Sequence, residues 1–315
     1  MKCVFVILAA VALALCLSCN APAEQTAAPQ TSLSAAVEAT EPVSPKPTAT
    51  PEPTAAPEPT DEPTPSPTPT PEPTPTPEPT PEPITDERLD AGEFDSFFDD
   101  AVFIGDSVTR TFGNYVNAQR RTDAHFLGDA RFMGAISMSV MNASSNRAYP
   151  GGITFTARGR AVSVTEGINV YEAKKAFILL CGNDIGFRSW DAVEGYYAKL
   201  IDIIHEKCPD TEVIMQGVFP VTEEYCRTER VTIERWNSFN EILERICDEH
   251  GATFLNFSDR LKGEQGYLPY AYSSDGRDHL SEQGEEIWVR SLRLFAAQRL
   301  HPDVEVLASE ISVHE

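Results

Sequence analysis

The distribution of proline limits what this chain can fold into more than any other feature. Twenty of the 25 prolines lie between residues 20 and 83, in near-repeats of Pro-Glu-Pro-Thr and Pro-Thr-Pro. Each proline lacks a backbone N–H and has a fixed φ, so this segment can form neither helix nor sheet and cannot bury a core. We therefore expect a disordered Pro/Thr/Glu-rich stalk over residues 20–83, which leaves residues 84–315 to fold as one domain.

The first 19 residues have the pattern of a signal peptide. Lys2 is followed by an apolar run, Val4 to Leu17, that is too short to cross a bilayer comfortably. Cys19 resembles the processing site of a lipoprotein, at which the cysteine is lipidated and becomes the new N-terminus. An alternative cleavage site at Ala21-Pro22-Ala23 would release the protein instead. The sequence thus predicts export, either as a membrane-anchored lipoprotein or as a secreted protein.

The folded domain is strongly acidic. Residues 84–315 contain 38 acidic and 23 basic residues, for a net charge of −15. Such a surface repels polyanions, which argues against nucleic acid and anionic lipid headgroups as partners.

Within this domain, apolar segments alternate with amphipathic ones. We expect four strands, at 101–104, 176–180, 212–219 and 253–257. They are followed in turn by four expected helices, at 108–119, 190–207, 232–250 and 282–299. Continuous apolar strands between helices are typical of a parallel sheet that is covered on both faces. The sequence predicts a three-layer α/β/α fold with a parallel sheet of about five strands, and a β-hairpin inserted near residues 152–164.

The segment Gly105-Asp106-Ser107 lies where the first of these strands meets its helix. A serine at that corner has its hydroxyl at the carboxyl edge of the sheet and its backbone N–H at a helix N-terminus. This is a suitable position for a nucleophile. The same residue types are also common helix N-caps, so the segment alone leaves both roles open.

Three further features follow the ends of apolar segments. Gly134 follows Phe132-Met133, Asn183 follows the strand at 176–180, and His279 precedes the last helix. Together with Ser107, in this order, they resemble the GDSL or SGNH hydrolase family, whose four blocks supply Ser, Gly, Asn and His. The resemblance covers the domain after residue 86 and implies the SGNH, flavodoxin-like type of α/β fold. Within this family, the whole chain resembles exported, lipoprotein-like esterases of Firmicutes that carry a Pro-rich stalk.

The resemblance implies a role for each residue. Ser107 would be the nucleophile that forms an acyl-enzyme, and His279 would be its general base. The backbone N–H groups of Ser107 and Gly134 and the side-chain amide of Asn183 would form the oxyanion hole.

The acid that orients His279 departs from the family pattern. The family places Asp three residues before His, and Gly276 occupies that position here. We favour Asp275, four residues before His279, because a bulge or a tighter turn could absorb one extra residue. Asp278 is the alternative, and a dyad in which a backbone carbonyl holds the imidazole is a third arrangement.

The sequence lacks the motifs that mark several other classes of active or binding site. The chain has no Gly-x-Ser-x-Gly elbow, no phosphate-binding loop, no Rossmann glycine pattern and no His-x-x-x-His spacing. We therefore expect no cofactor and no metal. The cysteines at 181, 208, 226 and 247 could pair in an exported protein, but their spacing identifies no partners.

The sequence thus predicts an extracytoplasmic serine esterase that cleaves small, acetyl-like acyl esters, with cell-wall or extracellular glycans as the expected substrates. An O-acyltransferase of the same fold and a non-catalytic cell-surface binding domain are the alternatives. A lipid on Cys19 would attach the protein to a membrane, and the domain is otherwise expected to be a monomer.

Overall fold

The computed structural model describes residues 82–180, 182–185 and 188–308. The chain divides into two units, Met1–Thr74 and Pro75–Glu315, and all described residues belong to the second. The predicted signal peptide with Cys19, and the stalk up to residue 81, lie outside the described residues, and the predicted domain boundaries stay predictions. Among the described residues, no helix is both long and apolar enough to cross a membrane.

A five-stranded parallel sheet forms the centre of this unit. Its strands, in spatial order, are β2 (Arg131–Gly134), β1 (Ala101–Gly105), β5 (Lys175–Leu179), β6 (Glu212–Gln216) and β7 (Thr253–Leu255). Every pairing between neighbours is parallel, and Gly105 lies opposite both Gly134 and Leu179. The predicted parallel sheet of about five strands is confirmed.

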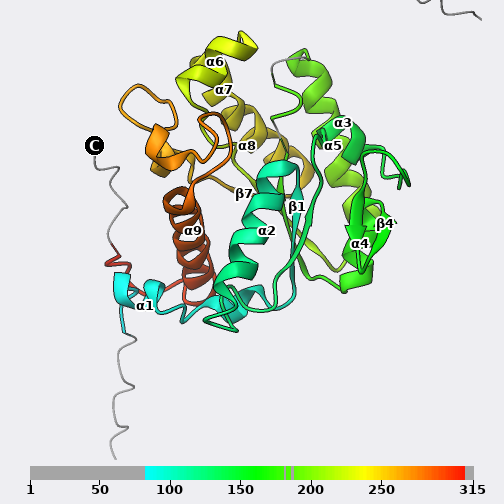
Figure 1. Ribbon diagram of the computed structural model, residues 1–315. Helices are drawn as coiled ribbons and strands as arrows, with labels where there is room; N and C mark the ends of the chain where they lie inside the picture. The colour runs from blue at the N-terminus through cyan, green and yellow to red at the C-terminus, as the bar shows by residue number, and fades with distance from the viewer. Residues whose placement is uncertain (1–81, 181, 186–187, 309–315) are drawn as a thin grey trace, which may run out of the picture. The chain divides into compact units, whose positions relative to one another are not determined.

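Side chains of β1 alternate between two hydrophobic cores, as the period of a β-strand requires. Val102 and Ile104 belong to one core, and Ala101 and Phe103 belong to the other. Helices on the first side of the sheet are α4 (Val164–Tyr171), α5 (Trp190–Lys207) and α8 (Phe239–His250). Helices on the second side are α2 (Ser107–Gln119) and α9 (Glu282–Leu300). The result is a three-layer α/β/α arrangement (Figure 1).

Aromatic rings fill the core on the side of α2 and α9. Phe103 stacks on Phe177 with ring centroids 4.7 Å apart, and Phe112 of α2 stacks on Trp288 of α9 at 3.9 Å. The first stack joins two strands and the second joins two helices, while an edge contact of Phe112 with Phe103 at 5.5 Å holds α2 against the sheet.

Most predicted elements match the structure within a few residues, and the differences have local causes. The predicted helix at 232–250 is two helices, α7 (Ile233–Asn237) and α8. The hydroxyl of Ser238 between them donates a hydrogen bond of 3.0 Å to the carbonyl of Arg235, a contact that bends helices. The predicted strand at 212–219 ends at Gln216, because the amide of Val218 donates to the side chain of Asn240 instead of to a neighbouring strand.

The predicted hairpin is also present. It consists of β3 (Phe155–Ala157) and β4 (Arg160–Val162), and Arg158 and Gly159 make the turn with φ values of +46° and +76°. The sequence analysis does not predict β2 or α4. It also does not predict the shorter elements α1 (Asp86–Asp90), η1 (Asp95–Phe98), α3 (Val140–Ser144), α6 (Glu223–Glu229), η2 (Ser258–Leu261) and η3 (Tyr270–Tyr272).

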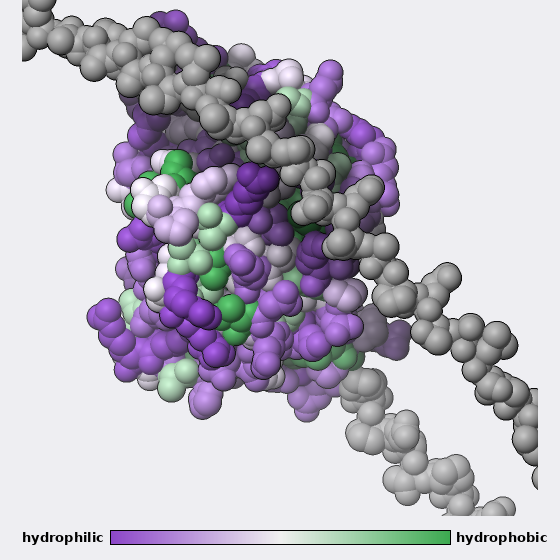
Figure 2. Space-filling view, turned by 90° about the vertical axis from the view of Figure 1, so that its right-hand side faces the viewer, coloured by the Kyte–Doolittle hydropathy of each residue, from purple (hydrophilic) through white to green (hydrophobic). Residues whose placement is uncertain are grey.

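One face of the domain is mainly hydrophilic. Figure 2 shows the face on the side of α3, α4 and β4, which is covered mainly by hydrophilic residues with hydrophobic ones in small groups. Large exposed hydrophobic side chains among the described residues include Ile136, Tyr149 and Tyr270.

Candidate active site

Ser107 is the first residue of α2, and Asp106 alone separates it from the end of β1. The carboxylate of Asp106 accepts a hydrogen bond of 3.0 Å from the amide of Val108 and is the N-cap of the helix. The capping role therefore belongs to Asp106. Among the described residues, the partly exposed hydroxyl of Ser107 has no hydrogen-bond partner.

Two glycines allow α2 to approach the sheet at this corner. A Cβ on Gly105 would lie 2.1 Å from Oγ1 of Thr109 in α2, and a Cβ on Gly134 would lie 2.4 Å from Cα of Arg110 in the same helix. Real Cβ contacts are never this short, so close packing requires glycine at both positions. Gly134 thus lies against the first turn of the helix that carries Ser107. Packing alone requires glycine at this position, whether or not its N–H binds an oxyanion.

Asn183 lies in the loop after β5. Its amide nitrogen Nδ2 donates to the carbonyl of Met138 at 3.0 Å and lies 3.5 Å from Oδ2 of Asp106. The amide therefore faces the residue that directly precedes Ser107. The second of these contacts is at the outer limit of a hydrogen bond.

Asp184 supports this loop, although the sequence pattern does not identify it. Its carboxylate is fully buried, accepts a hydrogen bond of 2.7 Å from the amide of Val140, and pairs with Arg188 at 3.2 Å. Burial raises the pKa of Asp184, against the effect of these contacts. The bond to Val140 holds the start of α3 against the loop that carries Asn183. Only the tertiary structure brings these two segments together.

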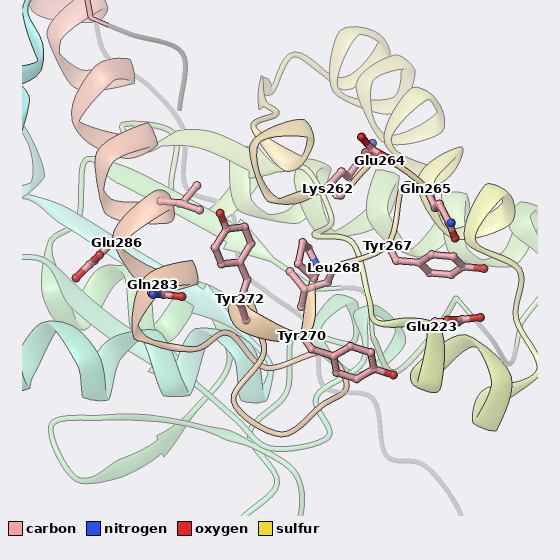
Figure 3. Close-up of a pocket in the computed structure, with 14 residues that line it drawn as sticks. Glu223, Lys262, Glu264, Gln265, Tyr267, Leu268, Tyr270, Tyr272, Gln283 and Glu286 are labelled. Atoms are coloured by element: carbon pink, nitrogen blue, oxygen red, sulfur yellow. The ribbon is translucent and has the colours of Figure 1, made fainter. Parts of the chain in front are cut away.

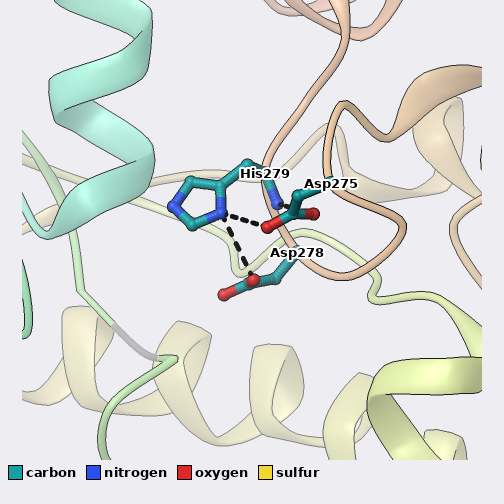
Figure 4. Close-up of side chains that lie close together, drawn as sticks. All are labelled: Asp275, Asp278 and His279. Carbon is teal, nitrogen blue, oxygen red and sulfur yellow. Dashed lines mark hydrogen bonds and ion pairs between the residues drawn. The ribbon is translucent and has the colours of Figure 1, made fainter.

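The described residues also show which carboxylate contacts His279. Oδ2 of Asp275 lies 2.6 Å from Nδ1 of His279, whereas Oδ1 of Asp278 lies 3.5 Å from the same nitrogen (Figure 4). Oδ1 of Asp275 also accepts a hydrogen bond of 2.8 Å from the amide of Arg277. The shorter contact belongs to Asp275, the acid that the sequence argument favours.

The backbone of this loop explains how an acid four residues away reaches the imidazole. Gly276 has φ of +72°, in the left-handed region that glycine adopts without strain. The amide of Ser274 donates to the carbonyl of His279 at 2.9 Å, and Ser273 forms an antiparallel bridge with Leu280. The loop therefore folds back on itself and returns the carboxylate of Asp275 to the ring.

The two carboxyl groups differ electrostatically. Burial opposes ionisation of Asp275, but hydrogen bonds from His279 and from the amide of Arg277 outweigh it, and the pKa of Asp275 is lowered. Burial raises the pKa of Asp278, and the neighbouring charge of Asp275 adds to the effect while His279 opposes it. Asp275 is therefore the better stabilised carboxylate. The possible ligand atoms of Asp275, Asp278 and His279 all lie within 4.8 Å of one another, so a cation could also bind there, in competition with the Asp275–His279 contact.

A small cavity connects the serine loop with the histidine loop. Its volume is about 20 Å³, and it is bordered by Asp106 and Val108 on either side of Ser107 and by Asp278 beside His279. The remaining walls are Leu179, Gly182, Phe219, Pro220, Val221 and Trp236. Among the described residues, no hydrogen bond joins Ser107 to His279.

Three of the four cysteines in the domain are described. Cys208, Cys226 and Cys247 are buried and form no disulfide with another described residue. Burial raises the pKa of Cys226 to about 11 and that of Cys247 to about 12, which leaves both thiols protonated and unreactive at neutral pH. Cys181 lies outside the described residues.

The sequence matches one family model, and the chain is similar to several solved structures. The model of the GDSL-like lipase/acylhydrolase family matches residues 103–287, a range that includes Ser107, Gly134, Asn183, His279 and both candidate acids. Similar solved structures include a protein described as an acylhydrolase from Bacteroides fragilis, at 15% identity over 64% of this chain and 87% of that chain, with a TM-score of 0.49. A GDSL-like lipase from Bacteroides thetaiotaomicron is 15% identical over 63% of this chain and 88% of that chain, with a TM-score of 0.47. An acetyl xylan esterase variant from Geobacillus stearothermophilus is 17% identical over 66% and 96%, with a TM-score of 0.44. No curated protein matches the sequence.

Proposed function

The chain belongs to the GDSL-like lipase/acylhydrolase family of ester-hydrolysing enzymes, and on that premise we propose that it is an exported serine esterase that removes small acyl groups from extracellular glycans. One observation carries the assignment of the site. His279 contacts the carboxylate of Asp275 at 2.6 Å, in a loop that shares a cavity with the residues on either side of Ser107.

The proposed reaction begins with attack of Ser107 Oγ on the ester carbonyl, while Nε2 of His279 accepts the hydroxyl proton. Asp275 stabilises the imidazolium through Nδ1. Collapse of the tetrahedral intermediate breaks the ester C–O bond, and His279 returns the proton to the departing alcohol. Water then attacks the acyl-enzyme with His279 again as base, which releases the carboxylic acid and restores Ser107.

The oxyanion of each tetrahedral intermediate needs donors that are already in place. We propose the backbone N–H groups of Ser107 and Gly134 and the side-chain amide of Asn183. The contact of the Asn183 amide with Asp106 is long, at 3.5 Å, so one amide hydrogen can turn toward an oxyanion at little cost. Removing one such donor costs roughly 3 to 4 kcal/mol of transition-state stabilisation.

The cavity of about 20 Å³ is lined by neighbours of Ser107 and His279 but by neither residue itself. The preference for a small acyl group therefore stays a prediction from the sequence. Several other properties also stay predictions from the sequence. They are the likeness to exported Firmicutes esterases, lipidation of Cys19, the extracellular location, the glycan substrate and a monomeric state.

Hydrolysis of p-nitrophenyl esters by the purified protein tests the proposal. We expect the acetyl ester to be cleaved fastest and the octanoyl ester slowest, and Ser107→Ala to abolish cleavage while the circular dichroism spectrum stays unchanged. Labelling of Ser107 by a fluorophosphonate would exclude the non-catalytic binding domain, and product analysis with a sugar acceptor would separate hydrolysis from acyl transfer. Equal rates for the wild type and Ser107→Ala would contradict the proposal.

A further inference from the structure

A groove of about 980 Å³ lies beside the catalytic loop. Its walls come from three segments: residues 262–272 between η2 and η3, the first residue of α6, and the first turns of α9. Figure 3 shows Gln283 and Glu286 of α9 on one side of Tyr272, with Tyr267 and Tyr270 on its other side. The mechanism proposed above uses none of these side chains.

The wall of the groove and the loop that carries His279 are joined by hydrogen bonds. The amide of Ser281 donates to the carbonyl of Tyr272 at 2.8 Å, and the amide of Ser273 donates to the carbonyl of Tyr270 at 3.2 Å. The ring of Tyr270 also lies next to Gly276, because a Cβ on that glycine would be 3.9 Å from Cε1 of Tyr270. A ligand in the groove would therefore lie beside the catalytic loop.

The side chains of the groove combine aromatic rings with hydrogen-bonding groups. Tyr270 is 59% exposed, and Tyr267 and Tyr272 are partly exposed. Gln265 and Gln283 also line the groove, and each offers both a donor and an acceptor. A sugar ring has apolar C–H faces and a rim of hydroxyl groups. Tyrosine rings suit the faces, and amide and carboxylate groups suit the hydroxyls.

The charge of the groove limits which sugars it can bind. Glu223, Glu264 and Glu286 line it, against one cation, Lys262, which is paired with Asp259 at 2.6 Å. Uncompensated carboxylates repel a polymer that carries its own carboxylates or phosphates. A neutral sugar chain meets no such penalty.

We propose that this groove binds the neutral oligosaccharide portion of the substrate and places its O-acyl group at Ser107. The inference rests on the proposed esterase function and names the substrate class. Tyr270 is the central contact, because it is the most exposed of the three rings and lies against the catalytic loop.

Binding to the full chain with Ser107→Ala tests this site independently of catalysis. The probes are xylohexaose, cellohexaose and mannohexaose as neutral sugars, and hexagalacturonate as the anionic one, measured by calorimetry. We expect at least one neutral probe to bind, hexagalacturonate not to bind, and Tyr270→Ala to weaken binding roughly tenfold. Tyr149→Ala is the matched control, because Tyr149 is 44% exposed and does not line the groove. Tighter binding of hexagalacturonate, no binding of any neutral probe, or equal effects of the two variants would overturn the inference.

Kinetics separate failure of this inference from failure of the esterase assignment. With a partially O-acetylated form of the neutral probe that binds, Tyr270→Ala should raise KM roughly tenfold and leave kcat unchanged. With p-nitrophenyl acetate, which is too small to reach the groove, Tyr270→Ala should lower kcat/KM far less than it does with the acetylated sugar. A wild-type protein that binds the sugar but cleaves neither ester would contradict the esterase proposal alone. Active enzyme with an unchanged KM in Tyr270→Ala would contradict the groove alone.

Discussion

Oδ2 of Asp275 lies 2.6 Å from Nδ1 of His279. The other oxygen of this carboxylate accepts hydrogen bonds from the hydroxyl of Ser273 at 3.2 Å and from the amide of Arg277 at 2.8 Å. The carboxylate is therefore held at both oxygens by its own loop. A carboxylate held in this way fixes the orientation of the imidazole without a contact to any other element.

Replacing the two acids should separate their roles. Asp275→Asn should lower kcat for p-nitrophenyl acetate about 10³- to 10⁴-fold, because the amide favours the wrong imidazole tautomer. Asp278→Asn should lower it by less than about tenfold, since its oxygen lies 3.5 Å from Nδ1. Steady-state kinetics on both purified variants measure the difference. A larger loss of kcat in Asp278→Asn than in Asp275→Asn would mean that Asp278 orients His279.

Gly276→Ala should impair both folding and catalysis. A side chain at φ of +72° costs about 1 kcal/mol of folding free energy and should displace Asp275, with a fall in kcat of at least about tenfold. Gly159→Ala is a matched control, because Gly159 has φ of +76° in the β3–β4 turn and an added Cβ would meet open space. Urea unfolding should show similar losses for both variants, whereas only Gly276→Ala should change kcat. Equal kcat values for Gly276→Ala and the wild type would show that the conformation of Gly276 does not affect the reaction.

Gly134→Ala should destabilise the junction of β2 and α2. The added Cβ would lie 2.3 Å from the amide nitrogen of Arg110, so backbone must move, at a cost of roughly 1 to 3 kcal/mol. Gly195→Ala inside α5 meets no atom within 4 Å and should instead stabilise the fold by up to about 1 kcal/mol. The free energy of urea unfolding measures both changes. A neutral Gly134→Ala would show that α2 can move away without cost.

Glu285→Gln should change how stability depends on pH. Burial raises the pKa of Glu285 well above its ordinary value, so its contribution to stability is complete below that value and is lost as pH rises through the folded-state pKa. Glutamine removes this loss. The variant should therefore gain unfolding free energy over the wild type at pH 8 and little at pH 4.

The control for this prediction is Glu282→Gln, an exposed glutamate in the same first turn of α9. Urea unfolding at pH 4, 6 and 8 should show no pH-dependent gain for that variant. A gain for Glu285→Gln that is equal at all three values would mean that packing, and not ionisation, distinguishes the two side chains.

The parts of the fold that the sequence predicts are those that local chemistry determines. β1 and β5 are continuous apolar runs, and burial on both faces of a parallel sheet requires that pattern. α3 is only five residues long, and its first amide is held by the distant carboxylate of Asp184. No local pattern identifies such a helix, because a short helix depends on tertiary contacts for its stability.

The site divides in the same way. From the sequence alone, Ser107 can be placed at a strand-to-helix corner, because the apolar strand, the capping Asp106 and the helix after it are neighbours in the chain. The contacts of His279 with the two acids could not be deduced, since Asp275 and Asp278 are both near it in sequence. Only the tertiary structure decides the distances, because Gly276 takes a left-handed conformation and the loop closes through Ser274 and His279. The groove depends on folding still more, since its tyrosines become a single surface only when residues 262–272 lie between α6 and α9.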